Sequence, residues 1–289
     1  MKNKSLLFSI AFVTIGFLNA NAQINFGEKA LGAVQKGVAG FTFSNADAAA
    51  LSKAAVDKMD AEHTIAGPKD PYAIRLNKVF GKHTQGDGFT LNYKVYILKE
   101  VNAFATADGS VRVYSGLMDI MDDNELLAVI GHEIGHVANH DSQDAMKAAY
   151  KKEALIDAVA SQSNKVAALT DSQLAKLGST MLDSKHSRKQ ESEADEYSYN
   201  FMKKKGYDVN AVSSAFSILA KMSEGSEASF LDKMMSSHPD SKERAQAAKE
   251  RAQADGLYKP YVRQIKNKLR KMEDQETAIK RKAIEDFNT

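Results

Sequence analysis

The sequence contains no cysteine. Disulfide bonds therefore cannot stabilise the fold, and the chain offers neither a thiolate ligand for a metal nor a thiol nucleophile. We also expect no lipid anchor of the kind that is attached to a cysteine. Any metal ion must instead be bound by imidazole and carboxylate groups, which limits the search for a metal site to His, Asp and Glu.

Long hydrophobic runs are also nearly absent. The one pronounced run, residues 6–18, follows two lysines and precedes Ala20-Asn21-Ala22. This arrangement predicts a secretory signal peptide over residues 1–22, cleaved after Ala22, because the run is short for a helix that crosses a bilayer. We therefore expect an exported protein that is soluble after cleavage. The bacterial periplasm is the expected location, with secretion or attachment to a membrane surface as alternatives.

An excess of charge of one sign is absent as well. The chain has 39 basic and 37 acidic residues, and the predicted signal peptide contains two of the basic ones. The remaining chain has no net formal charge, so we expect no nucleic-acid partner. With 289 residues, 43% of them hydrophobic, the chain is long enough for one substantial core and a smaller appendage.

Helical patterns predominate in the rest of the chain. Ser44 and Asp47 predict the start of a helix that continues over residues 48–59, and Asp122 with Glu125 predicts the start of another. Further helices are expected over residues 142–183, 187–205, 211–222 and 229–235, and in the charged segment from residue 245 onward.

Strand-like alternation is confined to one region. Residues 89–95 and 101–106 favour strands, and Asp108-Gly109 before residues 111–114 indicates a hairpin. We therefore predict an α+β fold, mainly helical, with a small β-sheet or hairpin before the helix that begins at Asp122. The predicted organisation is a signal peptide (1–22), a lead-in with one helix (23–74), a main domain (75–250) and a charged amphipathic C-terminal helix (251–289).

A candidate metal site lies on that helix, where residues 131–136 read Gly-His-Glu-Ile-Gly-His. Side chains four residues apart share one helix face, so His132 and His136 can bind the same metal ion. Glu133 projects beside them, where it can take a proton from a water activated by zinc. The alternative is a helix whose two histidines bind no metal.

A catalytic zinc needs a third protein ligand and an open position. His140 continues the spacing but rotates away from the shared face, so it is the weaker candidate. Glu191 is the better one, because Glu191 and Asp195 are again four apart and one can bind the metal while the other supports a ligand histidine. Glu193 points to a different face and is expected to be a solvated charge.

These motifs occur in a recognisable order. His132-Glu133-x-x-His136 is followed by Glu191-x-x-Ala194-Asp195 and by Ser237-His238-Pro239, with Arg244 five residues after the proline; Asn102-Ala103-Phe104-Ala105 and Gly206-Tyr207-Asp208 also match. In this respect the chain resembles the HtpX-like gluzincin zinc metallopeptidases, metallopeptidase family forty-eight, which also contains the CAAX prenyl endopeptidases. The resemblance covers roughly residues 75–250 and is greatest to the soluble periplasmic members. The chain departs from these members in having no lipid-attachment motif and no tetratricopeptide array.

The resemblance implies a zincin-type catalytic domain with one Zn²⁺ per chain. It implies Glu191 as the third metal ligand and Asp195 as a residue that supports a ligand histidine. It also implies that His238 and Arg244 reach the active site, where either could stabilise the oxyanion or cover the metal.

The expected substrates are extended or misfolded envelope proteins. Residues Asn102, Ala103, Phe104, Ala105 and Thr106 could form an edge strand that binds a peptide by backbone hydrogen bonds, or could equally be an ordinary interior strand. Basic and apolar residues over 259–271 fall at helical spacing, so this helix could contact a membrane surface or an outer-membrane assembly partner, although packing against its own domain is the more common role.

Two other functions compete with an active zinc endopeptidase. A metal-binding envelope chaperone or assembly factor with little proteolysis would keep the metal, but it would have no need of Glu133. An interaction protein with a chance motif would bind no metal at all.

Overall fold

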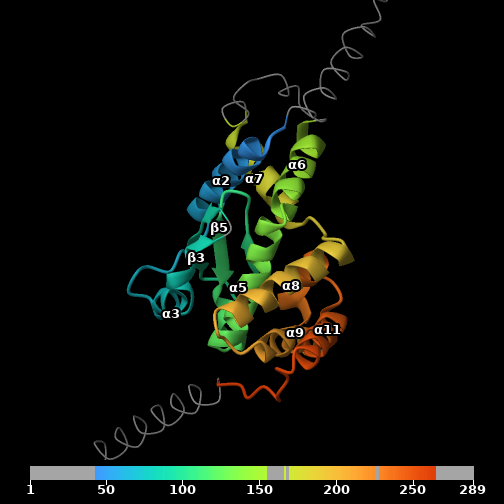
Figure 1. The fold of residues 1–289 in the computed structure, drawn as a ribbon. Coiled ribbons are helices and arrows are strands. Elements are labelled where there is room, and N and C mark those ends of the chain that lie inside the picture. Colours follow the sequence, from blue (N-terminus) through green and yellow to red (C-terminus); the bar gives the residue numbers. More distant parts are fainter. Residues whose placement is uncertain (1–42, 87, 155–165, 167–168, 225–227, 265–289) are drawn as a thin grey trace, which may run out of the picture.

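The computed structural model describes residues 43–264, except residues 87, 155–165, 167–168 and 225–227. The predicted signal peptide and residues 265–289 of the predicted C-terminal helix lie outside the described residues. Figure 1 shows helices gathered around a small sheet, so the predicted mainly helical α+β fold is confirmed. None of the described helices combines the length and the apolar character that a membrane crossing requires.

The sheet has three strands in the order β3 (Asn92–Tyr96), β5 (Ser110–Tyr114) and β4 (Ala103–Ala105). The predicted hairpin is present, because β4 and β5 are antiparallel and Gly109 occupies the turn with φ +85°, a conformation that favours glycine. The sequence did not predict that β3 pairs parallel with β5. Two very short strands, β1 (Gln85–Gly86) and β2 (Phe89–Thr90), form a separate pair.

Three helices pack together at one end of the molecule: α2 (Asn45–Glu62), α6 (Asp141–Ala154) and α7 (Asp171–Leu182). The predicted start of α2 is confirmed, since Ser44 and Asp47 form a reciprocal capping box. The single helix expected over residues 142–183 is instead two helices among the described residues. Thr170 and Gln173 form another capping box that begins α7 anew.

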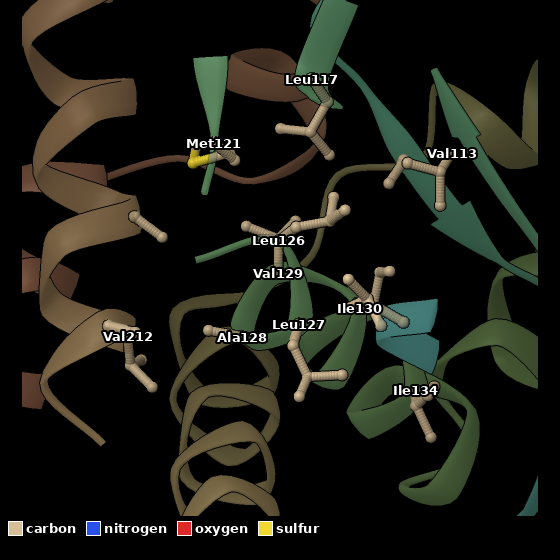
Figure 2. Packing of buried hydrophobic residues seen from close by; sticks show 14 of the residues in the cluster. Val113, Leu117, Met121, Leu126, Leu127, Ala128, Val129, Ile130, Ile134 and Val212 are labelled. Carbon is tan, nitrogen blue, oxygen red and sulfur yellow. The ribbon is translucent and has the colours of Figure 1, made fainter. Parts of the chain in front are cut away.

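Helix α5 (Asp123–Ala138) lies at the centre of the fold and begins at the predicted Asp122–Glu125 capping box. Its residues from Glu125 to Val137 are all buried, because other helices and the sheet pack around the helix. Figure 2 shows Leu126, Leu127 and Ile130 of α5 within a cluster that includes Val113 of β5. The cluster also takes in residues of α3 (Pro71–Phe80), which precedes the short helix η1 (Gly81–His83), and of α4 (Ser115–Ile120).

Helix α8 (Arg188–Lys204) packs closely against α5. A Cβ atom on Gly135 of α5 would lie 2.9 Å from Cα of Ala194, so only glycine permits this approach without a shift of the backbone. At Gly131 a Cβ would lie 3.2 Å from Oγ of Ser198. Four further elements follow α8: α9 (Asn210–Ser223), η2 (Ala228–Leu231), α10 (Asp232–Ser237) and α11 (Ser241–Ala254).

The C-terminal prediction holds only in part, because the charged segment from residue 245 is helical as far as Ala254 but not beyond it. Helix α11 ends at Ala254, Gly256 adopts φ +69°, and residues 257–264 are not helical. The positive φ at Gly256 and the ring of Pro260 account for the break. Residues 265–271 of the predicted basic helix lie outside the described residues.

Candidate metal centre

Helix α5 supplies two histidines and a glutamate to one buried point. His132, Glu133 and His136 are 2%, 3% and 2% exposed. The Nε2 atoms of the two histidines lie only 3.1 Å apart, because one turn of helix places both rings on the same face.

Glu191 from the first turn of α8 and His238, which follows α10, complete the group. Ligand atoms of His132, His136, Glu191 and His238 all lie within 4.8 Å of one another. The Oε1 atom of Glu191 is 3.4 Å from Nε2 of His136 and 3.0 Å from Nδ1 of His238. Nδ1 of His238 is also 3.2 Å from Nε2 of His132.

The opposite ring nitrogens of the two helix histidines contact carboxylates. Nδ1 of His132 lies 2.8 Å from Oδ1 of Asp195, and Nδ1 of His136 lies 2.8 Å from Oδ2 of Asp141. A histidine that donates from Nδ1 presents an unprotonated Nε2, which is the form that binds a metal. Both Nε2 lone pairs would therefore be directed at the shared centre.

Arg244 of α11 binds the carboxylates behind the ligand group. Its Nη1 lies 2.7 Å from Oε2 of Glu191, and its Nε and Nη2 donate to the two oxygens of Asp195 at 2.9 and 2.7 Å. The guanidinium carbon is 4.0 Å from the centre of the Phe216 ring. In this arrangement Arg244 fixes Glu191 and Asp195, which differs from the expectation that it stabilises an oxyanion or covers the metal.

The electrostatic environment favours a neutral His132 and ionised carboxylates at Asp195 and Glu191. Burial would lower the pKa of His136, but its hydrogen bonds with Asp141 and Glu191 raise it to about 9. Burial, with the Arg244 charge nearby, lowers the pKa of His132 to about 3. Burial alone would raise the pKa of Asp195, but Arg244 and the hydrogen bond from His132 hold it at about 2. The pKa of Glu191 is also lowered, since histidine contacts outweigh the effect of burial. Burial raises the pKa of Glu133, against the lowering effect of His238.

These residues fit a divalent metal ion. Two imidazole nitrogens and a carboxylate converge at one buried point, and this donor set is typical of a catalytic zinc. Oε1 of Glu133 is buried without a hydrogen-bond partner among the described residues. Nε2 of His238 lies 3.7 Å from this oxygen, so His238 faces Glu133 as well as the ligand group.

A cleft leads to Glu133 and His136 along strand β4. Its empty volume is about 470 Å³, including the open mouth. One part of its lining comes from Asn102–Ala105, and another from the end of α7 and the segment that follows it, with Met181, Leu182, Ser184 and His186.

The backbone of β4 directs alternate groups toward its open edge. The amide of Tyr114 donates to the carbonyl of Asn102, and the amide of Thr106 donates to the carbonyl of Ser110. In an antiparallel ladder, residues 103 and 105 then direct their backbone groups away from β5. The Asn102 side chain accepts from the Ala103 amide, and the Ser142 hydroxyl donates to the Ala105 carbonyl.

Two candidate residues lie outside the cluster, and two neighbours of the site were not predicted. His140 is exposed with φ +66° after the end of α5, and Glu193 is exposed near Lys189. Asp141 and His186 were both missed. Asp141 follows the turn at His140, which brings its carboxylate back to His136, and His186 belongs to a segment far along the chain. Neither position carries a local pattern that points to the site.

Comparisons with known proteins agree with this geometry. The chain matches Peptidase family M48 over residues 77–252. It is 40% identical over 264 residues to the metalloprotease LoiP of Escherichia coli K12, covering 89% of this chain and 100% of LoiP. It is 39% identical over 257 residues to the metalloprotease YcaL of the same organism, covering 87% of this chain and 98% of YcaL. A putative beta-barrel assembly-enhancing protease of Vibrio cholerae is 32% identical over 161 residues, 53% of this chain and 33% of that protein. The chain therefore belongs to peptidase family M48 and is a metallopeptidase.

Proposed function

We propose that this metallopeptidase is a zinc endopeptidase that hydrolyses extended or misfolded proteins of the bacterial envelope, with Glu133 as the general base. The observation that carries the proposal is the buried group of His132, His136 and Glu191 with the free carboxylate oxygen of Glu133 beside it. These three residues would hold the metal ion. A bound zinc would supply a Lewis acid that polarises the scissile carbonyl and lowers the pKa of water.

Glu133 has the properties that a general base requires. Its Oε1 accepts no hydrogen bond from the described residues, so it is free to accept a proton from the attacking water. Burial raises its pKa, which increases its affinity for that proton. The same carboxyl group can afterwards donate the proton to the leaving amine. His238, 3.7 Å from Glu133, is the neighbouring donor that could either assist the reaction or restrain it.

The open edge of β4 is the proposed binding site for substrate. A peptide in extended conformation could accept from the Ala105 amide and donate to the Ala103 carbonyl. Such bonds use only backbone groups and therefore suit proteins of many sequences. The β4 side chains are at most 9% exposed, so the cleft would have to widen to admit a chain.

An envelope location is supported by the N-terminal sequence. The basic residues, apolar run and Ala20-Asn21-Ala22 have the order of a secretory signal peptide. The name of the Vibrio cholerae relative refers to assembly of β-barrels, and by analogy misassembled envelope proteins are the proposed substrates.

Replacing Glu133 by Gln tests the proposed chemistry. The amide keeps the shape of the side chain but cannot accept the proton, so turnover of unfolded casein should fall by a factor of about 10² or more. Zinc content, measured by atomic emission on the purified protein, should stay near one per chain because Glu133 is not a proposed ligand.

Three results would contradict the proposal. Normal cleavage by Glu133→Gln protein would exclude Glu133 as the base. A protein that retains no zinc after reconstitution at neutral pH would exclude the metal site itself. Zinc binding without cleavage of any unfolded protein would favour a metal-binding chaperone.

A further inference from the structure

His186 lies in the cleft beside the proposed metal ligands. It belongs to the segment between α7 and α8, and its ring stacks on that of His136 with a centroid distance of 3.8 Å and an interplanar angle of 14°. Its backbone amide donates to the carbonyl of Ser237 at 3.1 Å. These contacts hold the ring at a defined place in the cleft lining, where it remains partly exposed.

The His186 ring differs from the serine hydroxyls of the lining. The hydroxyls of Ser142, Ser184 and Ser237 each donate to a backbone carbonyl. Within residues 43–264, apart from the stretches that the structure leaves undescribed, no hydrogen bond or ion pair involves the nitrogens of the His186 ring. A neutral imidazole offers one donor and one acceptor, so this ring brings two unused groups to the cleft.

An extended substrate needs partners on two sides. Backbone donors and acceptors project from both edges of a strand, and β4 can satisfy only the edge that faces it. The groups on the other edge would lose water in a narrow cleft, and an unpaired buried polar group is costly. A polar side chain in the part of the lining that does not belong to β4 would satisfy one of them.

We propose that His186 is a substrate-binding residue that forms a hydrogen bond with the backbone of the bound peptide. This inference rests on the proposed function and adds a second contact to that of β4. A metal site formed by His136, Asp141 and His186 is the competing interpretation of the same cluster. It is disfavoured because the two oxygens of Asp141 already contact His136 and Gln190.

The test measures peptide binding in the absence of cleavage. Zinc-loaded Glu133→Gln protein is titrated into a fluorescently labelled casein peptide, and the dissociation constant is obtained from anisotropy. His186→Phe in the same background keeps an aromatic ring against His136 but removes both nitrogens. We expect it to weaken peptide binding about tenfold, as for a lost hydrogen bond to a buried group, with unchanged zinc content. His186→Ala should weaken binding at least as much.

His63→Phe is the matched control. His63 also stacks on an aromatic ring, that of Tyr96 at 4.8 Å and 5°, but it does not line the cleft. This variant should bind the peptide as the Glu133→Gln protein does. Equal binding with and without His186→Phe would overturn the inference, and so would loss of zinc in His186→Phe, since the residue would then only support His136. Failure of the Glu133→Gln protein itself to bind the peptide would count against the proposed function as well.

Discussion

Glu191 is the residue on which the proposed metal site depends most. Its carboxylate contacts both helix histidines, His238 and Arg244, although it comes from a different helix from the motif. Glu191→Ala should therefore cause far greater loss of zinc on dialysis against a chelator than wild type shows, because a metal with one ligand removed is held less tightly.

Glu193→Ala and His140→Ala are the controls for this change. Both side chains are exposed and lie outside the ligand group, so both variants should retain zinc like the wild type. Similar zinc loss in all three variants would show that Glu191 has been assigned the wrong role.

His238 lies where its ring could occupy the fourth metal position in place of water or substrate. Its Nδ1 is within hydrogen-bonding distance of both Glu191 and His132 and belongs to the four-residue ligand group. We therefore expect His238→Ala to raise the initial rate of casein cleavage, because the fourth position becomes open to water and substrate. Zinc content should change little, since three ligands remain.

A lower or unchanged rate of cleavage by His238→Ala would assign the residue a different role. A fall in rate of about 10² with unchanged zinc would indicate that His238 donates to the oxyanion. An unchanged rate would mean that the residue has only a structural role.

At this scale, sequence reasoning found the residues that repeat with helical spacing. His132 with His136, and Glu191 with Asp195, are each four apart, so a local pattern indicated which pairs share a face. Glu191 was selected as the third ligand from its pairing with Asp195, and the resemblance assigned it the same role. Ser237-His238 was connected to the motif only through the resemblance. Asp141 and His186 could not be found, because their places depend on a turn and on a linker whose geometry is set by the tertiary fold.

At the scale of elements, Asp60 joins helix α2 to the sheet. Its oxygens accept hydrogen bonds from Arg112 of β5 at 2.8 and 2.9 Å, from Lys94 at 2.6 Å and from Tyr96 at 2.7 Å. The Arg112 side chain is only 2% exposed. Loss of Asp60 would leave this guanidinium buried without its counterion.

Asp60→Ala should lower the free energy of unfolding by about 3 kcal/mol at neutral pH. Asp57→Ala is the control on the same helix, because its pair with Lys53 is exposed and should contribute about 1 kcal/mol or less. Urea unfolding followed by circular dichroism measures both. Equal effects would mean that burial of Arg112 does not matter.

The ion pair between Asp60 and Arg112 should also make the stability of the fold depend on pH. Burial would raise the pKa of Asp60, but the hydrogen bonds from Arg112 and Lys94 lower it from 3.8 to about 2. A carboxyl whose folded pKa is depressed stabilises the fold above its unfolded pKa and loses this contribution as pH falls. The stability difference between wild type and Asp60→Asn should therefore be largest above about pH 4 and shrink toward pH 2. A constant difference over this range would contradict the assignment.

Elements were predicted well where the signal is local. Capping residues such as Ser44 and Asp122 indicated helix starts correctly, because a cap involves only residues within one turn. The β4–β5 hairpin was found for the same reason. The parallel pairing of β3 with β5 was not, since it joins segments whose order in the sheet no local pattern specifies.

At the scale of the whole molecule, the C-terminal segment returns to the start of α5. The Tyr261 hydroxyl donates to Asp122, and Arg263 contacts both oxygens of Glu125, which is 0% exposed. Composition suggested an amphipathic helix here, but these long-range bonds together with Gly256 and Pro260 favour a segment that is not helical.

Arg263→Ala should destabilise the protein by about 2 kcal/mol, because the buried Glu125 loses its cationic partner. Lys259→Ala is the control, since its pair with Asp208 involves a lysine that is 66% exposed. Thermal unfolding should separate the two variants, while zinc content stays normal in both. A melting temperature of Arg263→Ala equal to that of the control would mean that this segment contributes little to the fold.

Gly135 takes no part in the chemistry, yet it limits how the motif can vary. A methyl group at this position would meet Cα of Ala194 at 2.9 Å, and α8, which carries Glu191, would have to move away. Metal–ligand distances in such sites vary by only about 0.2 Å. Even a small separation of the two helices would therefore lower the affinity for the metal. The affinity for the metal should therefore depend on the distance between α5 and α8. Among related natural sequences, the affinity for the metal should vary with the size of the residues at the contact between α5 and α8, although these residues do not touch the ion.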